Sequence, residues 1–594
     1  MQFMIKYVRK YGVLFVISVL LVTLEAVGDL LQPTIMARII DEGVAAKDMD
    51  TVLRLGGVML IVTACGAAAA SIRNFTSSIV SQRFGADLRQ ELFEKIQRLA
   101  FANIDKFDKA SLVTRLTNDV TQIQNFLNGM MRIFVKAPLL GVGGLVMAFR
   151  LNPYLATVLL VVIPIVGMLI IFNMRIGFPL FLRVQMALDR LNSVMREYLS
   201  GVRVVKAFNR FGYETDKFND INKQYEKTSI RSQRMMAIFS PGVALAMNAG
   251  IVAVIALGGL RVEGGHMQVG HIVAFVNYML QILFSLTTVT LITNMFVRAK
   301  ASSGRIAEVL AEQNPMGYSK MAGESSAPCF SGAATVQGEV LAAAGAVEFD
   351  RVSFSYEGAA GETALRSVSF RCEPGETVAI IGSTGSGKST LAKLVSRFYD
   401  PTSGTVRVNG QDIRQIDPAL LRERIALVPQ QAILFAGTVL ENIRIGKQDA
   451  SLDEVTAAAE QAAAHAFIAE LPERYESIIG QGGVNFSGGQ KQRVSIARAL
   501  VRKPEILLLD DCTSALDSDT EAAVKRSIRE LGGSVTCLLI AQRISSVKDA
   551  DKIVVLDDGE VAGIGTHAQL LAECEVYREI YRSQIGEEAN HHVQ

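Results

Sequence analysis

A glycine-rich segment in the second half of the chain has the residue types needed to bind phosphate groups. It consists of Gly382, Ser383, Thr384, Gly385, Ser386, Gly387, Lys388, Ser389 and Thr390. This order fits the phosphate-loop pattern G-x-x-x-x-G-K-[ST], whose glycines let the backbone approach a triphosphate closely. Lys388 would reach the β- and γ-phosphates, and the Ser389 hydroxyl would bind Mg²⁺. The segment therefore predicts ATP and Mg²⁺ as cofactors.

The residues on either side of this segment are those that a phosphate loop requires. The apolar run 378–381 predicts a buried parallel strand, and residues 391–398 predict a helix whose N-terminal dipole favours an anion. A structural glycine-rich turn is the alternative. It would not need a strand, a lysine and a helix in register, so we favour a nucleotide site.

Two further motifs in this half could act on a nucleotide. The apolar run 506–509 ends in Asp510 and predicts a central parallel strand, whose aspartate would bind Mg²⁺ through water. A helix predicted over 491–501 follows Ser487, Gly488, Gly489 and Gln490. The start of that helix would be a second anion site. Since one nucleotide does not need two such sites, we expect this one to serve a nucleotide held by another subunit; an ordinary helix cap is the alternative.

The first half of the chain is predicted to lie in a membrane. Six segments are long and apolar enough to cross a bilayer of about 30 Å. They are 11–40, 52–82, 127–149, 154–182, 236–260 and 271–297. Short connections alternate with two long ones rich in lysine and arginine, 83–126 and 183–235. The positive-inside rule places the long connections and both termini in the cytosol. A net charge of +2 gives no indication of a nucleic-acid partner.

The two long connections are predicted to be helical stalks. Leu188, Leu191, Met195 and Tyr198 keep a three-four spacing, as in a coiled-coil seam. A stalk of this length would hold a turn well below the membrane, near 103–109 in one connection and 208–215 in the other. Helix packing without a signalling role is the simpler explanation of the same pattern.

Glu25 and Asp29 lie one turn apart in the first predicted span. Charges inside a membrane are costly unless they are paired or hydrated, which makes them functional candidates. An acidic lining of an outward gate and a charge at the membrane rim both remain open. Four amides in the later spans would line a cavity or bond neighbouring helices. They are Asn248, Asn277, Gln281 and Asn294.

These features predict a polytopic α-helical membrane domain, with six transmembrane helices and long cytosolic extensions, fused to an α/β P-loop nucleotide-binding domain. The membrane domain would span residues 1–312 and the nucleotide-binding domain 346–585. Residues 313–345, rich in glycine, alanine and serine, would form a linker, and 586–594 a tail.

Taken together, the motifs resemble those of ATP-binding cassette (ABC) exporter half-transporters over nearly the whole length. Tyr356 matches the aromatic residue that stacks on adenine, and Gln430 the glutamine that links Mg²⁺ to the membrane domain. Ser487–Gln490 matches the family signature and Asp517 the D-loop aspartate. The resemblance also implies that the stalk turns are coupling helices that dock on nucleotide-binding domains.

The chain departs from the family at three positions. Asp511 stands where a glutamate normally activates the attacking water, and Gln542 where a switch histidine contacts the γ-phosphate. Gln481 replaces a usual glutamate before the signature. Misplacing a catalytic base by about 1 Å costs on the order of a hundredfold in rate. Asp511-Cys512-Thr513 together with Gln542 resembles the degenerate half of bacterial heterodimeric multidrug exporters.

The resemblance implies one subunit of a heterodimeric, ATP-driven exporter in the plasma membrane, which moves small lipophilic compounds, such as drugs, across the lipid bilayer. This chain's own ATP site would be weakly active. The competent site would combine a homologous partner's phosphate loop, glutamate and histidine with this chain's signature. An ATP-gated pore, a regulatory subunit, or a lipid or peptide exporter are the alternatives. The six spans exclude a soluble cassette ATPase acting on nucleic acid.

Overall fold

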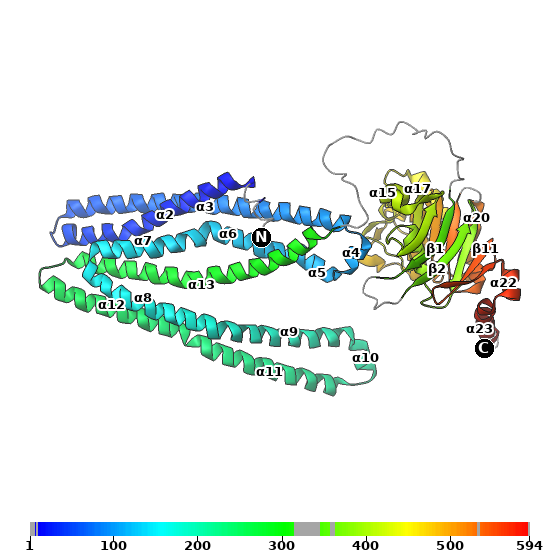
Figure 1. Cartoon of the computed structure of the whole chain (residues 1–594). Coiled ribbons are helices and arrows are strands. Elements are labelled where there is room, and N and C mark those ends of the chain that lie inside the picture. Colours follow the sequence, from blue (N-terminus) through cyan, green and yellow to red (C-terminus); the bar gives the residue numbers. More distant parts are fainter. Residues whose placement is uncertain (1–5, 7–9, 314–344, 357–362, 532–534, 592–594) are drawn as a thin grey trace. The chain divides into compact units, whose positions relative to one another are not determined.

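The computed structural model describes residues 6, 10–313, 345–356, 363–531 and 535–591 (Figure 1). It divides into two compact units. The first comprises residues 1–97 and 109–312, and the second comprises 98–108 and 313–594. Nearly all of the expected linker, and the last residues of the expected tail, lie outside the described residues.

The first unit is a bundle of long helices. The described part of the chain contains six helical segments long and apolar enough to cross a membrane, which confirms the predicted number of spans. The segments run over Gly12–Val44, Met49–Arg98, Lys109–Leu151, Pro153–Ser200, Phe211–Glu263 and Val269–Ala311. Their α-helices are α2 (Gly12–Arg38), α3 (Met49–Arg98), α5 (Lys109–Thr114), α6 (Val120–Gly129), α7 (Val135–Leu151), α8 (Pro153–Phe172), α9 (Phe178–Ser200), α11 (Phe211–Ala237), α12 (Phe239–Glu263) and α13 (Val269–Ala311). Short π-helical turns, such as η4 (Asn173–Gly177), join several of them.

Local sequence explains how these helices begin and pack. The Asn152 side chain accepts hydrogen bonds from the backbone N–H groups of Tyr154 and Leu155, at 3.0 and 3.1 Å, and Pro153 occupies the first position of α8. A capping side chain before a proline is a strong helix start, so the chain reverses tightly between α7 and α8. Apolar residues of α8, α12 and α13 form the buried core of the bundle.

Both stalks contain breaks in their helices. α3 ends at Arg98, α4 (Phe101–Asp105) follows, and α5 begins at Lys109. α9 ends at Ser200, and a short helix, α10 (Val202–Ala207), lies at the turn before α11 (Figure 1). The breaks therefore lie close to the positions at which the sequence predicts turns, while their role in coupling stays a prediction.

Glu25 and Asp29 belong to a cluster of charges inside the bundle. Arg73 Nη1 lies 2.8 Å from Glu25 Oε2. Lys136 Nζ lies 2.6 Å from Glu25 Oε1 and 2.8 Å from Asp29 Oδ2. Glu25 is only 8% exposed, and mutual pairing offsets part of the cost of removing these charges from water. The carboxylates of the first span are thus paired with cationic side chains of α3 and α7.

The second unit is built on a mainly parallel sheet. Its strand order is β12-β11-β3-β10-β9-β6, and only the edge strand β12 runs antiparallel to its neighbour. These strands are β3 (Thr377–Gly382), β6 (Ile425–Val428), β9 (Ile506–Asp510), β10 (Thr536–Ile540), β11 (Lys552–Asp557) and β12 (Glu560–Gly565). Burial on both faces explains the unbroken apolar runs of β3 and β9. The carboxyl ends of β3, β10 and β9 consequently meet at one edge of the sheet.

Smaller sheets and helices complete this unit. An antiparallel sheet has the order β2-β1-β4-β5, and β7 pairs with β8. These strands are β1 (Val347–Phe354), β2 (Leu365–Cys372), β4 (Ser403–Val408), β5 (Gln411–Asp412), β7 (Gly437–Thr438) and β8 (Ile478–Ile479). The helices are α14 (Lys388–Val395), α15 (Pro418–Arg424), α16 (Val439–Arg444), α17 (Leu452–Gln461), α18 (His465–Ala469), α19 (Gly488–Leu500), α20 (Ser518–Glu530), α21 (Ile544–Val547), α22 (His567–Glu573) and α23 (Glu575–His591). The predicted α/β domain is thereby confirmed.

Residues 98–108 pack within the second unit. The ring centroids of Phe101 and Phe398 lie 4.4 Å apart, and the Tyr399 hydroxyl donates a hydrogen bond to Asp105. Burial, reinforced by the neighbouring Asp105 carboxylate, raises the pKa of Tyr399. Short α4 is therefore held to this unit by both aromatic and polar contacts.

Candidate nucleotide-binding site

The glycine-rich segment connects the end of β3 to the start of α14. The backbone of Gly385 has φ +91° and that of Gly387 φ +93°, in the left-handed region that favours glycine. A Cβ at Gly387 would lie 2.5 Å from the Ala364 carbonyl oxygen, and one at Gly382 would lie 2.1 Å from that of Leu556. Side chains would therefore break the loop. The helix begins at Lys388, earlier than the residues 391–398 expected from sequence, so Lys388 and Ser389 stand in its first turn.

A cavity of about 290 Å³ lies beside this loop. Its lining residues are Tyr356, Ala364, Thr384, Gly385, Gly387, Lys388, Ser389, Thr390, Gln430, Asp510, Asp511, Ile540 and Gln542. The structure thus brings together most of the predicted nucleotide-binding residues. Gly382, Ser383 and Ser386 belong to the same loop without lining the cavity.

Lys388 is positioned at the base of the cavity by its own loop. Its Nζ donates hydrogen bonds to the carbonyl oxygens of Gly382 at 2.9 Å and Ser383 at 2.6 Å. The residue is 7% exposed, and this burial lowers the pKa of its ammonium group. The loop carbonyls keep the cation where a phosphate oxygen could become its next partner.

Ser389 and Asp510 form a pair of oxygen ligands. Ser389 Oγ donates to Asp510 Oδ1 at 2.8 Å, and burial raises the pKa of the Asp510 carboxyl group. Among the described residues, no group of three or more histidine, cysteine, aspartate or glutamate side chains could hold a metal. Mg²⁺ commonly binds one or two protein oxygens and completes its shell with phosphate oxygens and water. The pair therefore fits Mg²⁺ that arrives with a nucleotide.

Asp511 is held by two side-chain amides. Its Oδ2 accepts a hydrogen bond from Gln430 Nε2 at 3.0 Å and one from Gln542 Nε2 at 3.1 Å. Burial raises the pKa of this carboxyl group. The Gln542 backbone is held in turn, because its carbonyl oxygen accepts from Gln584 Nε2 of α23 at 2.8 Å. Two of the three positions at which the chain departs from the family pattern, Asp511 and Gln542, are therefore in direct contact.

Tyr356 closes another side of the cavity, next to α14. Its hydroxyl lies 3.1 Å from Thr390 Oγ1, and Lys393 Nζ donates to it at 3.2 Å. The same ammonium lies 5.2 Å from the centre of the Tyr356 ring. Neither Lys393 nor Gln584 was predicted from the sequence. Lys393 follows the phosphate-loop lysine after little more than one helical turn, which is the one signal that could have suggested it.

The signature residues lie outside this cavity, at the start of α19. Ser487 Oγ accepts from the Gln490 N–H at 3.3 Å, and Gln490 Oε1 accepts from the Ser487 N–H at 2.9 Å, forming a capping box. The helix cap left open as an alternative is thus present. Ser487 and Gly488 are nonetheless exposed, and a Cβ at Gly488 would meet no atom within 4 Å. Asp517 caps α20 by accepting from the Thr520 N–H at 3.0 Å.

Comparisons with known proteins match both units. The ABC transporter transmembrane region matches residues 15–286, and the ABC transporter family matches residues 365–514. The ABC transporter ATP-binding protein YfiB of Bacillus subtilis is 40% identical over 99% of this chain and 100% of its own length. A fatty acid ABC transporter ATP-binding/permease protein of Mycobacterium bovis is 33% identical over 85% of this chain and 77% of its own. A solved structure of a bacterial Atm1-family ABC exporter with ATP bound has a TM-score of 0.75 and 25% identity, covering 97% of this chain and 98% of that one.

Proposed function

This chain belongs to the ABC transporters as an exporter half-transporter, an ATPase coupled to transport, and we propose that it is the weakly hydrolysing subunit of a heterodimer. In this proposal its own site holds ATP without rapid turnover. A homologous partner, carrying the usual glutamate and histidine, supplies the competent site, and this chain completes that site with its signature.

The contact between Asp511 and the amides of Gln430 and Gln542 carries the proposal. A general base must lie within hydrogen-bond reach of the attacking water, and without that position a suitable pKa does not make it effective. The Asp511 carboxylate is one methylene shorter than a glutamate, and one of its oxygens accepts from both amides. A glutamine at position 542 has no imidazole that could contact the γ-phosphate. The arrangement favours retention of ATP over its hydrolysis.

The rest of the cavity suits Mg²⁺ and ATP. The loop N–H groups, Lys388 and Ser389 would hold the phosphates, Asp510 and Gln430 would support Mg²⁺, and Tyr356 would contact the adenine. Bound Mg²⁺ would neutralise negative charge on the phosphates. Ser389, Gln430 and Asp510 already line one cavity.

The exposed start of α19 supports the crossed arrangement of sites. Its first residues lie outside this chain's cavity, and the N-terminus of a helix favours an anion. If each of two half-transporters places the start of this helix against the other's cavity, each completes the other's nucleotide site.

The membrane unit supports export of lipophilic compounds across the plasma membrane, with both termini in the cytosol. Because one relative is named as a fatty acid transporter, we include lipids among the substrates proposed for this chain. An ATP-gated pore is the second candidate, and it is favoured only by the weak hydrolysis expected at Asp511.

Transport into sealed vesicles tests the proposal. Vesicles containing this chain and its partner should accumulate a lipophilic dye against its gradient with ATP, and should fail to do so with a non-hydrolysable analogue. Movement down the gradient alone, in response to either nucleotide, would favour the gated pore.

A further inference from the structure

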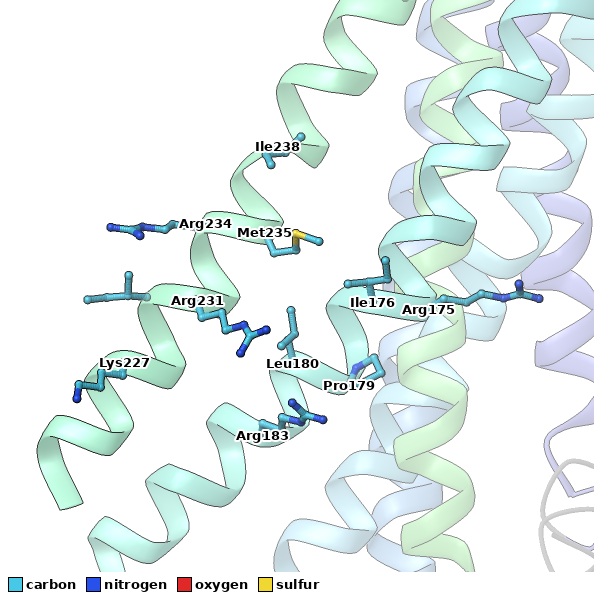
Figure 2. A pocket seen from close by; sticks show the side chains of 11 residues that line it. Arg175, Ile176, Pro179, Leu180, Arg183, Lys227, Arg231, Arg234, Met235 and Ile238 are labelled. Atoms are coloured by element: carbon cyan, nitrogen blue, oxygen red, sulfur yellow. The ribbon is translucent and has the colours of Figure 1, made fainter. Parts of the chain in front are cut away.

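A cleft of about 810 Å³ lies between the fourth and fifth membrane segments, where their apolar stretches end (Figure 2). We name it the basic cleft. It is lined from η4 and α9 by Arg175, Ile176, Pro179, Leu180 and Arg183, and from α11 and α12 by Lys227, Ile230, Arg231, Arg234, Met235 and Ile238. It belongs wholly to the first unit and lies outside the nucleotide site.

Two of its arginines line the space between the helices. Figure 2 shows Arg231 of α11 directed into this space, next to Leu180, and Arg183 of α9 lines the cleft three residues further along. Lys227 and Arg234 are directed away from it, on the outer side of α11. Within the described residues, no acidic side chain lines the cleft. The two guanidinium groups therefore lack a negative partner there.

This combination of charge and apolar surface indicates a particular kind of ligand. Like charges that line one apolar cleft repel, and an anion between them would remove that cost. Guanidinium groups bind carboxylates and phosphates through paired hydrogen bonds. The remaining walls, formed by side chains such as Ile176, Leu180 and Met235, suit a hydrocarbon chain.

We propose that the basic cleft binds an amphiphile with an anionic head group. Its carboxylate or phosphate lies between Arg183 and Arg231, and its acyl chain lies along the apolar walls toward the bilayer. As a statement about the exported compound this rests on the proposed function, but as a binding site it stands independently of transport. A free fatty acid and an anionic phospholipid share the required chemistry.

Photolabelling tests the site. The full-length chain, assembled as purified, is placed in phosphatidylcholine nanodiscs and labelled with a photoreactive palmitic acid. Labelling should map to residues 175–183 and 227–238. R183Q/R231Q should reduce it about tenfold or more, because two charge-assisted contacts are lost.

The outward-facing cations provide a matched control. K227Q/R234Q removes the same charge from the same region and should leave labelling within about twofold of the wild-type level, because these two side chains extend to the outer side of α11, away from the cleft. R183K/R231K keeps the charge without the planar fork and should retain an intermediate level, which also shows that the fold tolerates changes here. An equal loss in both glutamine double variants would mean general surface attraction and would overturn the proposal.

Competitors distinguish the ligand sources. Displacement by palmitate identifies a fatty acid site, displacement by phosphatidylglycerol identifies a lipid site, and either supports the proposal. Displacement by palmityl alcohol or by inorganic phosphate as effectively as by palmitate would contradict it. Absence of wild-type labelling in the cleft, as when a second chain covers it, would also overturn it. ATPase activity of the same samples, measured alongside, reports on the proposed function separately.

Discussion

Gln542 Nε2 lies 3.1 Å from Asp511 Oδ2, and it donates a hydrogen bond to that oxygen. The strands β10 and β9 that lead into these residues are adjacent and parallel, with Ile540 opposite Asp510 in register. The register therefore makes Asp511 and Gln542, two of the departures from the family pattern, direct neighbours. Because the two side chains are in contact, the effects of changing them should be coupled, which makes them suitable for a double-mutant analysis.

We expect Asp511→Glu to restore little hydrolysis at this site, and Asp511→Glu with Gln542→His to restore more than the sum of the single changes. The base at position 511 and the γ-phosphate contact at position 542 act on the same reaction, so the gain in rate from both changes together should exceed the sum of the separate gains. Steady-state ATPase rates of the singles and the double, in the heterodimer, give the coupling. Nucleotide occlusion should survive in all of them, because Lys388, Ser389 and Asp510 are unchanged.

Asp511→Ala provides the control for this pair. It should be far milder than neutralising the partner's glutamate, which should nearly abolish turnover. Equal damage from the two changes would show that Asp511 is a working base and would contradict the weak-site proposal.

The purified chain alone should hydrolyse ATP at least about a hundredfold more slowly than its mixture with the partner, since two copies would form two weak sites. The measurement is steady-state ATPase with a metal-free blank subtracted. A chain that turns over rapidly by itself would be inconsistent with an asymmetric pair.

Ser487→Ala should lower the heterodimer's ATPase by roughly 10²–10³, because a preorganised donor region next to the transferring phosphoryl group is lost. Ser451→Ala removes the same kind of capping serine from α17, where no nucleotide is expected. That control should cost only about 1 kcal/mol of stability and leave turnover near the wild-type level. Similar rates for the two variants would indicate that Ser487 is only a helix cap.

Glu25→Gln should lower the free energy of unfolding by about 3–5 kcal/mol, because Arg73 and Lys136 lose a buried partner. Asp87→Asn breaks the exposed pair with Lys10 and should cost no more than about 1 kcal/mol. The midpoints of thermal unfolding of the two variants in detergent, followed by the fluorescence of a dye that binds the unfolded chain, compare the two changes. Equal midpoints would show that the Glu25 cluster does not stabilise the bundle.

The sequence predicts those parts of the fold that depend on neighbouring residues. The phosphate loop, the strand ending in Asp510 and the six apolar spans follow from local composition, and the structure has the strands and spans where they were expected. The cations around Glu25 could not be predicted, because Arg73 and Lys136 come from other helices whose rotation depends on packing. The same holds for the contact of Gln430 with Asp511, which joins residues far apart in the chain.

The packing of residues 98–108 has a consequence for how this protein can be divided into fragments. The second unit includes a stretch that the ribosome makes between two membrane helices, long before the rest of that unit. A fragment starting at residue 346 would lack Phe101 and Asp105, and would expose the ring of Phe398 and leave the Tyr399 hydroxyl without its carboxylate. Because one unit is interleaved with the other along the chain, no single continuous fragment without membrane helices contains the whole second unit.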